Sequence, residues 1–240
     1  KSAEIIKPIL RGRDIKFYSY DFNDLYLIAT FPSLKINIDD YPVVRNYLQS
    51  FGRKLHQSGE DFIGENGKKE KTRKKTGNQW FETQDQITYW NDFERTKIIY
   101  PETTQGPYFY FDKDSKYYIE KTCFMITSKN SNLLLYLFTL LRSKLITYFF
   151  TNFFTGVDLS SSGYQHNKHA LEKTPIIPME NADQNIKEKL IIFSKKMVDL
   201  IELGTPLDEV KYYQNEIDDL IFKLYSLNEE EILIINNDRQ

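Results

Sequence analysis

The residues best suited to chemistry form a short, strongly basic run in the first third of the chain. Glycines lie before and after it, and such a context favours an exposed loop. Side chains of like charge repel one another unless anions lie between them. We therefore expect contacts with nucleic-acid phosphates, although a solvated loop without a partner would have the same sequence. The basic residues are Lys68, Lys69, Lys71, Arg73, Lys74 and Lys75.

Amide and guanidinium side chains near this run are candidates for distinguishing one base pair from another. Asn78 and Gln79 follow the run, and amides pair with adenine in the major groove. Arg11 and Arg13 lie near the start of the chain. Their guanidinium groups could read guanine or could equally form surface ion pairs with nearby aspartates. Trp80 could stack on a base, but core packing is the more common role of an indole.

Catalytic motifs are absent from the sequence. It has no glycine-rich turn of the kind that holds S-adenosylmethionine, and no Asn/Asp-Pro-Pro-Tyr/Phe motif of an adenine methyltransferase. The single cysteine, Cys123, lies in an apolar run and is expected to be a buried thiol. His166 and His169 have no acidic partner at ligand spacing. We therefore expect no catalytic site, no metal site and no cofactor in this chain.

The elements that must position these residues are predicted to be both strands and helices. Apolar runs bounded by turn residues predict strands at 25–30, 97–101, 108–111, 117–119 and 121–127. Helical spacing of apolar residues predicts helices at 40–58 and 133–154. The expected fold is mixed α/β (α+β): a curved, largely antiparallel sheet with packed helices, followed by a C-terminal helical hairpin.

The C-terminal part of the chain differs from the rest in pattern and in charge. Two apolar stripes, at 186–201 and 210–224, are separated by Gly204-Thr205-Pro206 and predict an antiparallel pair of helices. Residues 176–240 carry 7 Lys/Arg and 14 Asp/Glu, whereas the chain as a whole has a net charge of −2. We therefore expect a boundary at residues 175 and 176.

Seven segments spread over the chain form an ordered series. In this order they resemble the TaqI-like specificity region of type IIG restriction–modification enzymes and of related adenine-specific DNA methyltransferases. One departure is Arg142, where asparagine is usual. The segments are 6–15 (IKPILRGRDI), 40–42 (DYP), 73–84 (RKKTGNQWFETQ), 97–102 (KIIYPE), 140–145 (LLRSKL), 171–178 (LEKTPIIP) and 216–227 (EIDDLIFKLYSL).

The resemblance implies that residues 1–175 form a DNA target-recognition domain and that 176–240 form a helical appendage. It implies a parent chain with an N-terminal adenine-N6 DNA methyltransferase, with or without restriction endonuclease activity. The parent would use S-adenosylmethionine, and Mg²⁺ where it also cleaves DNA. The absence of an initiator methionine agrees with an excised part of a longer protein. The implied partners are double-stranded DNA and the methyltransferase region of the same chain, in the cytoplasm and away from any membrane.

Two other functions fit parts of the same sequence. The acidic C-terminal helices would suit a protein-interaction module that docks on a methyltransferase or on another phage-defence subunit. A nuclease with an unrecognised active site is the second alternative. Salt-sensitive binding of DNA would argue against the first alternative as the whole function, and magnesium-dependent cleavage would decide for the second.

Overall fold

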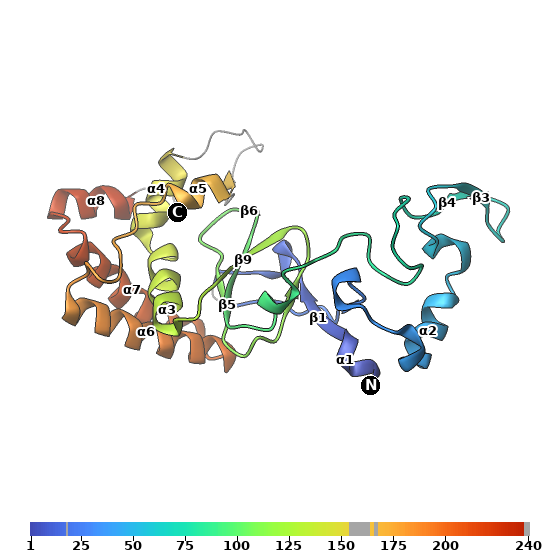
Figure 1. Ribbon diagram of the computed structural model, residues 1–240. Coiled ribbons are helices and arrows are strands. Elements are labelled where there is room, and N and C mark those ends of the chain that lie inside the picture. The colour runs from blue at the N-terminus through green and yellow to red at the C-terminus, as the bar shows by residue number, and fades with distance from the viewer. Residues whose placement is uncertain (18, 154–163, 166–167, 238–240) are drawn as a thin grey trace. The chain divides into compact units, whose positions relative to one another are not determined.

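The structure is a computed structural model that describes residues 1–17, 19–153, 164–165 and 168–237 (Figure 1). The chain divides into two compact units. The first unit comprises residues 1–9 and 24–92, and the second comprises 10–23 and 93–240. The predicted mixed α/β class is confirmed, with helices, small antiparallel sheets and a helical C-terminal part. The expected boundary at residue 175, between a recognition domain and a helical appendage, stays a prediction.

The first unit is built around a small apolar core. Its buried side chains come from the ends of short elements and from one helix, and the half-buried Trp80 packs against them. The core residues are Ile5, Ile38, Val44, Leu48 and Phe81. The elements are α1 (Ser2–Ile5), β1 (Ile6–Leu10), β2 (Tyr26–Ile28), η2 (Pro32–Leu34), η3 (Ile38–Asp40), α2 (Pro42–Gln49), η4 (Gly52–Leu55), β3 (Asp61–Ile63), β4 (Lys69–Lys71) and η5 (Trp90–Asp92).

The second unit places helices against a three-stranded sheet of order β7-β5-β9. The central strand is wholly buried, including the charged Lys97 at its start. Its elements are η1 (Gly12–Asp14), β5 (Lys97–Pro101), β6 (Thr103–Thr104), β7 (Tyr110–Asp112), β8 (Tyr118–Ile119), β9 (Cys123–Thr127), α3 (Ser131–Leu141), α4 (Lys144–Phe153), β10 (Tyr164–Gln165), α5 (Lys168–Glu172), α6 (Gln184–Glu202), α7 (Leu207–Leu224) and α8 (Glu229–Asn237).

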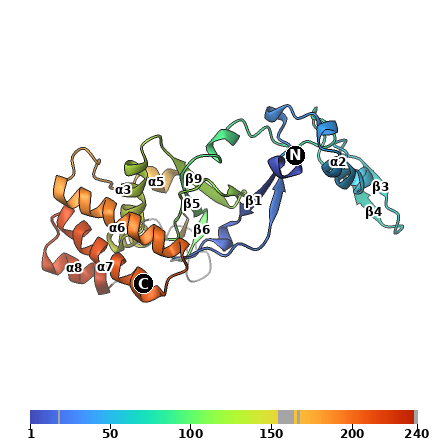
Figure 2. The same ribbon diagram turned by 90° about the horizontal axis from the view of Figure 1, so that it is seen from below.

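The largest apolar core lies where α3, α6 and α7 pack together in the second unit (Figure 1). α6 and α7 form the predicted helical hairpin and lie side by side in Figure 2, whereas α8 packs against α4. α3 packs against α6 and also against β5. The C-terminal helices therefore share their core with the elements that precede residue 175.

The long helix predicted at 133–154 is wrong as a single helix. It consists of α3 and α4, which are bent by 60° where they meet. The Ser143 hydroxyl donates to the Leu140 carbonyl and accepts the Ile146 N–H, and the Lys144 N–H bonds to Asp218 at 2.8 Å. Side chains thus replace helical hydrogen bonds at the break. The predicted end, Phe154, lies outside the described residues.

No single helix of the described ranges is long and apolar enough to cross a membrane. Only α3 and α4 taken together pass that test, as the bent pair. Seven of the eleven residues of α3 are buried within the fold, which accounts for its apolar composition.

Three further expectations are corrected in the arrangement of short elements. The helix predicted at 40–58 ends at Gln49, and Gly52, with φ of 55°, leads into η4. Within the described residues the antiparallel strands form four small sheets of two or three strands and not one curved sheet. Part of the basic run, predicted as a loop, is strand β4.

Candidate nucleic-acid interface

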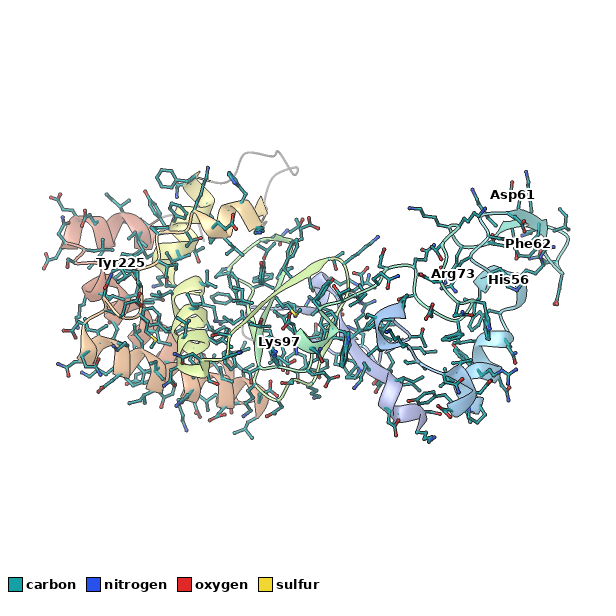
Figure 3. The ribbon with its side chains drawn as sticks, in the orientation of Figure 1. His56, Asp61, Phe62, Arg73, Lys97 and Tyr225 are labelled. Carbon is teal, nitrogen blue, oxygen red and sulfur yellow. The ribbon has the colours of Figure 1, made fainter. Side chains whose placement is uncertain are left out.

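The basic run is held on a β-hairpin in the first unit. β3 and β4 pair antiparallel, and the turn between them uses Gly67 with φ of 72°, which favours glycine. Pairing continues beyond the strands, because the N–H groups of Thr72 and Arg73 donate to the carbonyls of Glu60 and His56, each at 2.9 Å. Figure 3 shows His56 and Arg73 at the base of this hairpin. The cations are therefore carried on a hydrogen-bonded frame.

Alternation along β4 separates its side chains into two faces. Glu70 is half-buried and lies 3.1 Å from the Lys54 ammonium group. Lys69 and Lys71 are exposed, and Lys69 lies 3.4 Å from Asp61. An exposed pair of this kind contributes little stability. This face therefore remains available to an external anion.

Four of the six predicted cations are exposed and are engaged by no ion pair within the described part of the chain. They are Lys68, Lys71, Lys74 and Lys75. Their clustering on one hairpin raises the local positive potential, which phosphates would lower.

Arg73 differs from its lysine neighbours because its guanidinium group is turned into the protein. Its Nε and Nη2 donate to the Leu55 carbonyl at 2.9 and 2.7 Å. Nη1 donates to the Glu82 carbonyl at 2.9 Å, and Nη2 also bonds to the Trp80 carbonyl. Burial lowers the pKa of this guanidinium group. Arg73 thus joins η4 to the segment that follows the hairpin.

The two predicted amides are placed differently. The Asn78 amide donates to the carbonyls of Thr83 and Gln84, at 2.9 and 3.0 Å. Gln79 uses its backbone N–H to bind the Glu82 carboxylate at 2.6 Å, and its side chain is exposed. Asn78 therefore shapes the loop, whereas the side chain of Gln79 is accessible to a base edge.

Trp80 packs at the rim of the first unit's core. Its indole meets the Phe81 ring edge-on, with centroids 5.7 Å apart, and it is half-buried. This contact accounts for the aromatic residue through packing, the more common of the two roles weighed from the sequence.

The two N-terminal arginines belong to the second unit, whereas the hairpin belongs to the first. Arg11 binds Asp14 through Nε at 2.9 Å and Nη2 at 3.0 Å, and the pKa of Asp14 is lowered despite the opposing effect of its burial. The Arg11 side chain is therefore occupied by the aspartate that the sequence offered as its alternative partner. Arg13 is exposed.

Two cations beside the hairpin were not among the predicted residues. Arg53 and Lys54 lie on η4, and Arg53 covers the Phe62 ring at 5.2 Å. The Arg53 guanidinium group also lies 3.7 Å from the Glu60 carboxylate. In the sequence, Arg53 and Lys54 stand at the end of an amphipathic run, well before the basic residues. Only the fold of the hairpin brings them close to those residues.

The described residues contain no group of three or more His, Cys, Asp or Glu side chains arranged to hold a metal ion. His166 lies outside the described residues. Cys123, the first residue of β9, is buried as predicted, and burial raises the pKa of its thiol to about 12. A thiol in this state is a packing group.

A solved structure shares the fold. It is described as "Characterization and crystal structure of the type IIG restriction endonuclease BpuSI", and its TM-score to this chain is 0.52 at 11% sequence identity. The alignment covers 92% of this chain and 26% of that one, so the chain spans about a quarter of the length of that structure. No curated protein matches the sequence.

The family comparison covers most of the chain. The model described as "TaqI-like C-terminal specificity domain" matches residues 7–176, well over half of the 240 residues. The matched range includes the basic hairpin, the amide-bearing loop after it and both N-terminal arginines. The chain therefore belongs to the family of TaqI-like C-terminal specificity domains.

Proposed function

We propose that this chain recognises a target sequence in duplex DNA as the specificity region of a restriction–modification protein. The observation that carries the proposal is the hairpin of the first unit, with its exposed cations on a hydrogen-bonded frame. Between residues 53 and 75 the sequence has eight Lys/Arg against four Asp/Glu. Membership of the specificity-domain family supports the same function.

The exposed cations are proposed to position the chain on the DNA backbone. Lysine side chains bind phosphates through charge, and such contacts add affinity without reading sequence. Lys68, Lys69, Lys71, Lys74 and Lys75 are the residues assigned to this role. Arg73 is assigned a supporting role instead, since its guanidinium group binds three backbone carbonyls.

Base reading is proposed for Gln79 and Arg13, whose side chains are exposed. A glutamine amide can donate to and accept from adenine in the major groove, and a guanidinium group can pair with guanine. Asn78 and Arg11 are assigned to shaping the loop and the N-terminal turn, because their side chains are bonded within the protein.

The proposed recognition domain is residues 1–175, with 176–240 as a helical appendage. The family match, which ends at residue 176, supports this division. We propose that the parent chain carries an adenine-N6 methyltransferase, with or without an endonuclease, and that the appendage packs against it. The similarity in fold to part of a type IIG enzyme supports such a parent.

The proposal is tested by measuring DNA affinity against salt concentration. Fluorescence anisotropy of a labelled duplex is followed between about 50 and 200 mM salt for the intact chain and for a variant with Lys68, Lys71, Lys74 and Lys75 changed to Gln. We expect the slope of log K against log salt to fall by about one for each lost phosphate contact.

A matched control removes the same charge elsewhere. Lys189, Lys195, Lys196 and Lys223 are exposed on α6 and α7, and their change to Gln is expected to leave the slope unaltered. Equal slopes for the hairpin variant and the unaltered chain would refute the proposed role of the hairpin. A lower slope in the control variant alone would move the DNA-binding face to the C-terminal helices.

A further inference from the structure

The loop that follows the basic hairpin carries amide side chains in place of cations. Residues 76–92 contain five Asn/Gln and no Lys/Arg. Of the three carboxylates in this segment, that of Glu82 is buried, that of Asp92 is half-buried and that of Asp85 is exposed. Phosphate contacts need positive charge, whereas base edges are read by amides and carboxylates as well. The composition of the loop therefore fits the base edges of a duplex, and that of the neighbouring hairpin fits its backbone.

The two ends of this loop are held together by the Asn78 side chain. Its Nδ2 group donates to the carbonyls of Thr83 and Gln84, at 2.9 and 3.0 Å. Both partners are acceptors, which fixes the orientation of the amide and places its oxygen toward Gln86. That oxygen accepts a hydrogen bond from the Gln86 Nε2 group at 3.3 Å. The N–H groups and the oxygen of Asn78 are thus used within the loop.

Gln84 and Gln86 are exposed, and each amide is held by a single hydrogen bond. The Gln84 Nε2 group donates to the Lys74 carbonyl at 3.4 Å, as that of Gln86 does to Asn78. One N–H and the oxygen of each amide are engaged by no other group of the described residues. Adenine offers N7 as an acceptor and its N6 amino group as a donor in the major groove, and so binds that pair. The single bond orients each amide in advance, which lowers the entropic cost of binding.

The backbone directly after Gln86 is strained. Ile87 has φ of 48°, in the left-handed region that branched residues rarely adopt. Its carbonyl accepts the Ser33 hydroxyl at 3.0 Å, which ties this turn to η2. Such a conformation costs about 1–3 kcal/mol and persists where the surrounding structure imposes it, most often at functional sites. The strained turn thus fixes the chain beside the second of the two exposed amides.

We infer that Gln84 and Gln86 are specificity-determining residues and that each reads an adenine of an A·T pair in the major groove. The Oε1 atom accepts from the N6 amino group, and the remaining N–H donates to N7. Lys74, whose carbonyl holds Gln84, meets a neighbouring phosphate with its ammonium group. The inference rests on the proposed function, since it places base reading in the unit whose hairpin binds the DNA backbone. It adds two residues to Gln79 and names the base.

Selection from a duplex library with a randomised centre, with the intact chain as the binding protein, tests the inference. The selected duplexes should share adenine at two or more positions. Gln84→Ala and Gln86→Ala should each lose a preference of about five- to a hundredfold for adenine at one of these positions and keep the rest of the sequence. Both side chains are exposed, so the variants are expected to fold as the unaltered chain does. Gln49→Ala, at an exposed position of α2 in the same unit, is the matched control and should select the unaltered sequence.

Replacement of the adenine by 7-deazaadenine separates base reading from a structural role. This base pairs normally with thymine but lacks N7, the acceptor for the glutamine N–H. At the position assigned to Gln86 it should weaken binding by the unaltered chain about five- to tenfold and leave binding by Gln86→Ala unchanged. A variant that had only disturbed the loop would stay sensitive to the replacement, and that result would count against the inference.

The salt dependence of binding keeps this inference apart from the proposed function. The hairpin variant with four lysines changed should bind every duplex more weakly and still select the adenines. A selected sequence without adenine, or one that both glutamine variants retain, would overturn the inference and leave the phosphate contacts of the hairpin in place. Salt-dependent binding by the unaltered chain without any selected sequence would do the same. Failure of the intact chain to bind any duplex would remove the proposed function as well.

Discussion

The ammonium nitrogen of Lys97 lies 2.6 Å from a carboxylate oxygen of Asp112, and the two side chains are only 0% and 1% exposed. The pair joins β5 to β7, where Lys97 and Asp112 are opposite each other. The ammonium group also donates to the Phe93 carbonyl at 2.7 Å, and the carboxylate accepts two backbone N–H groups at 2.9 Å. Burial lowers the pKa of Lys97, an effect that the neighbouring carboxylate opposes.

Removal of one charge of this pair should leave the other buried and unpaired. Lys97→Met is expected to lower the free energy of unfolding by about 3–5 kcal/mol, measured by chemical denaturation. The double variant Lys97→Met/Asp112→Asn should lose less, since no buried charge remains. Lys113→Met, which breaks the exposed pair with Asp199, should cost no more than about 1 kcal/mol. Equal losses in the single and double variants would contradict this explanation.

We expect Arg73 to matter more through the hydrogen bonds that its guanidinium group makes within the first unit than through its positive charge. Arg73→Lys keeps the charge, but one ammonium group cannot replace the planar set of donors that binds three carbonyls. We expect a loss of about 2–4 kcal/mol, seen as faster hydrogen exchange at residues 56–76. The neighbouring Lys74→Met, at an exposed position, is the control. Unchanged exchange in Arg73→Lys would return Arg73 to the list of phosphate contacts.

Asn78 and Gln79 should separate stability from specificity. Asn78→Ala removes a side chain that donates to two carbonyls, so unfolding should become easier by about 1–3 kcal/mol. Gln79→Ala should leave stability within about 0.5 kcal/mol. Where Gln79 reads a base, its loss should cost about 1–3 kcal/mol on the cognate site alone, measured in the proposed methyltransferase-linked parent. A uniform loss on all sequences would assign Gln79 to the DNA backbone.

Local patterns predicted the elements whose structure depends on local sequence. β5 was predicted with its observed bounds because an apolar run ends at a proline, and both helices of the C-terminal hairpin followed from their apolar stripes. The break between α3 and α4 was missed. It is stabilised by Asp218, whose carboxylate is 74 positions away from the Lys144 N–H that it accepts. No local pattern reports such a partner.

The residue types of the candidate site were predicted from the sequence, but the directions in which their side chains point were not. Arg73 and Lys74 are adjacent and alike in charge, yet one guanidinium group binds backbone carbonyls and the other side chain faces solvent. The difference follows from the path of the chain after the hairpin, which brings the carbonyls of Trp80 and Glu82 to Arg73. A loop was predicted for this run, and a loop has no alternating faces. The sequence therefore could not tell which of the two side chains faces the protein and which faces solvent.

The buried carboxylate of Asp218 should make stability depend on pH. Burial raises its pKa from 3.8 to about 6, although the Lys144 N–H and the Gln214 amide oppose the shift. Because the folded state binds this proton more tightly, its contribution to stability is greatest below about pH 4 and is lost as the pH rises through 6. Asp218→Asn, which retains an acceptor for the Lys144 N–H, should therefore stabilise the chain at pH 7 relative to its effect at pH 4, by about 1–3 kcal/mol. Denaturant unfolding at the two pH values measures this, with the exposed Asp219→Asn as the control. The same change in stability at both pH values would mean that Asp218 titrates alike in the folded and unfolded chain.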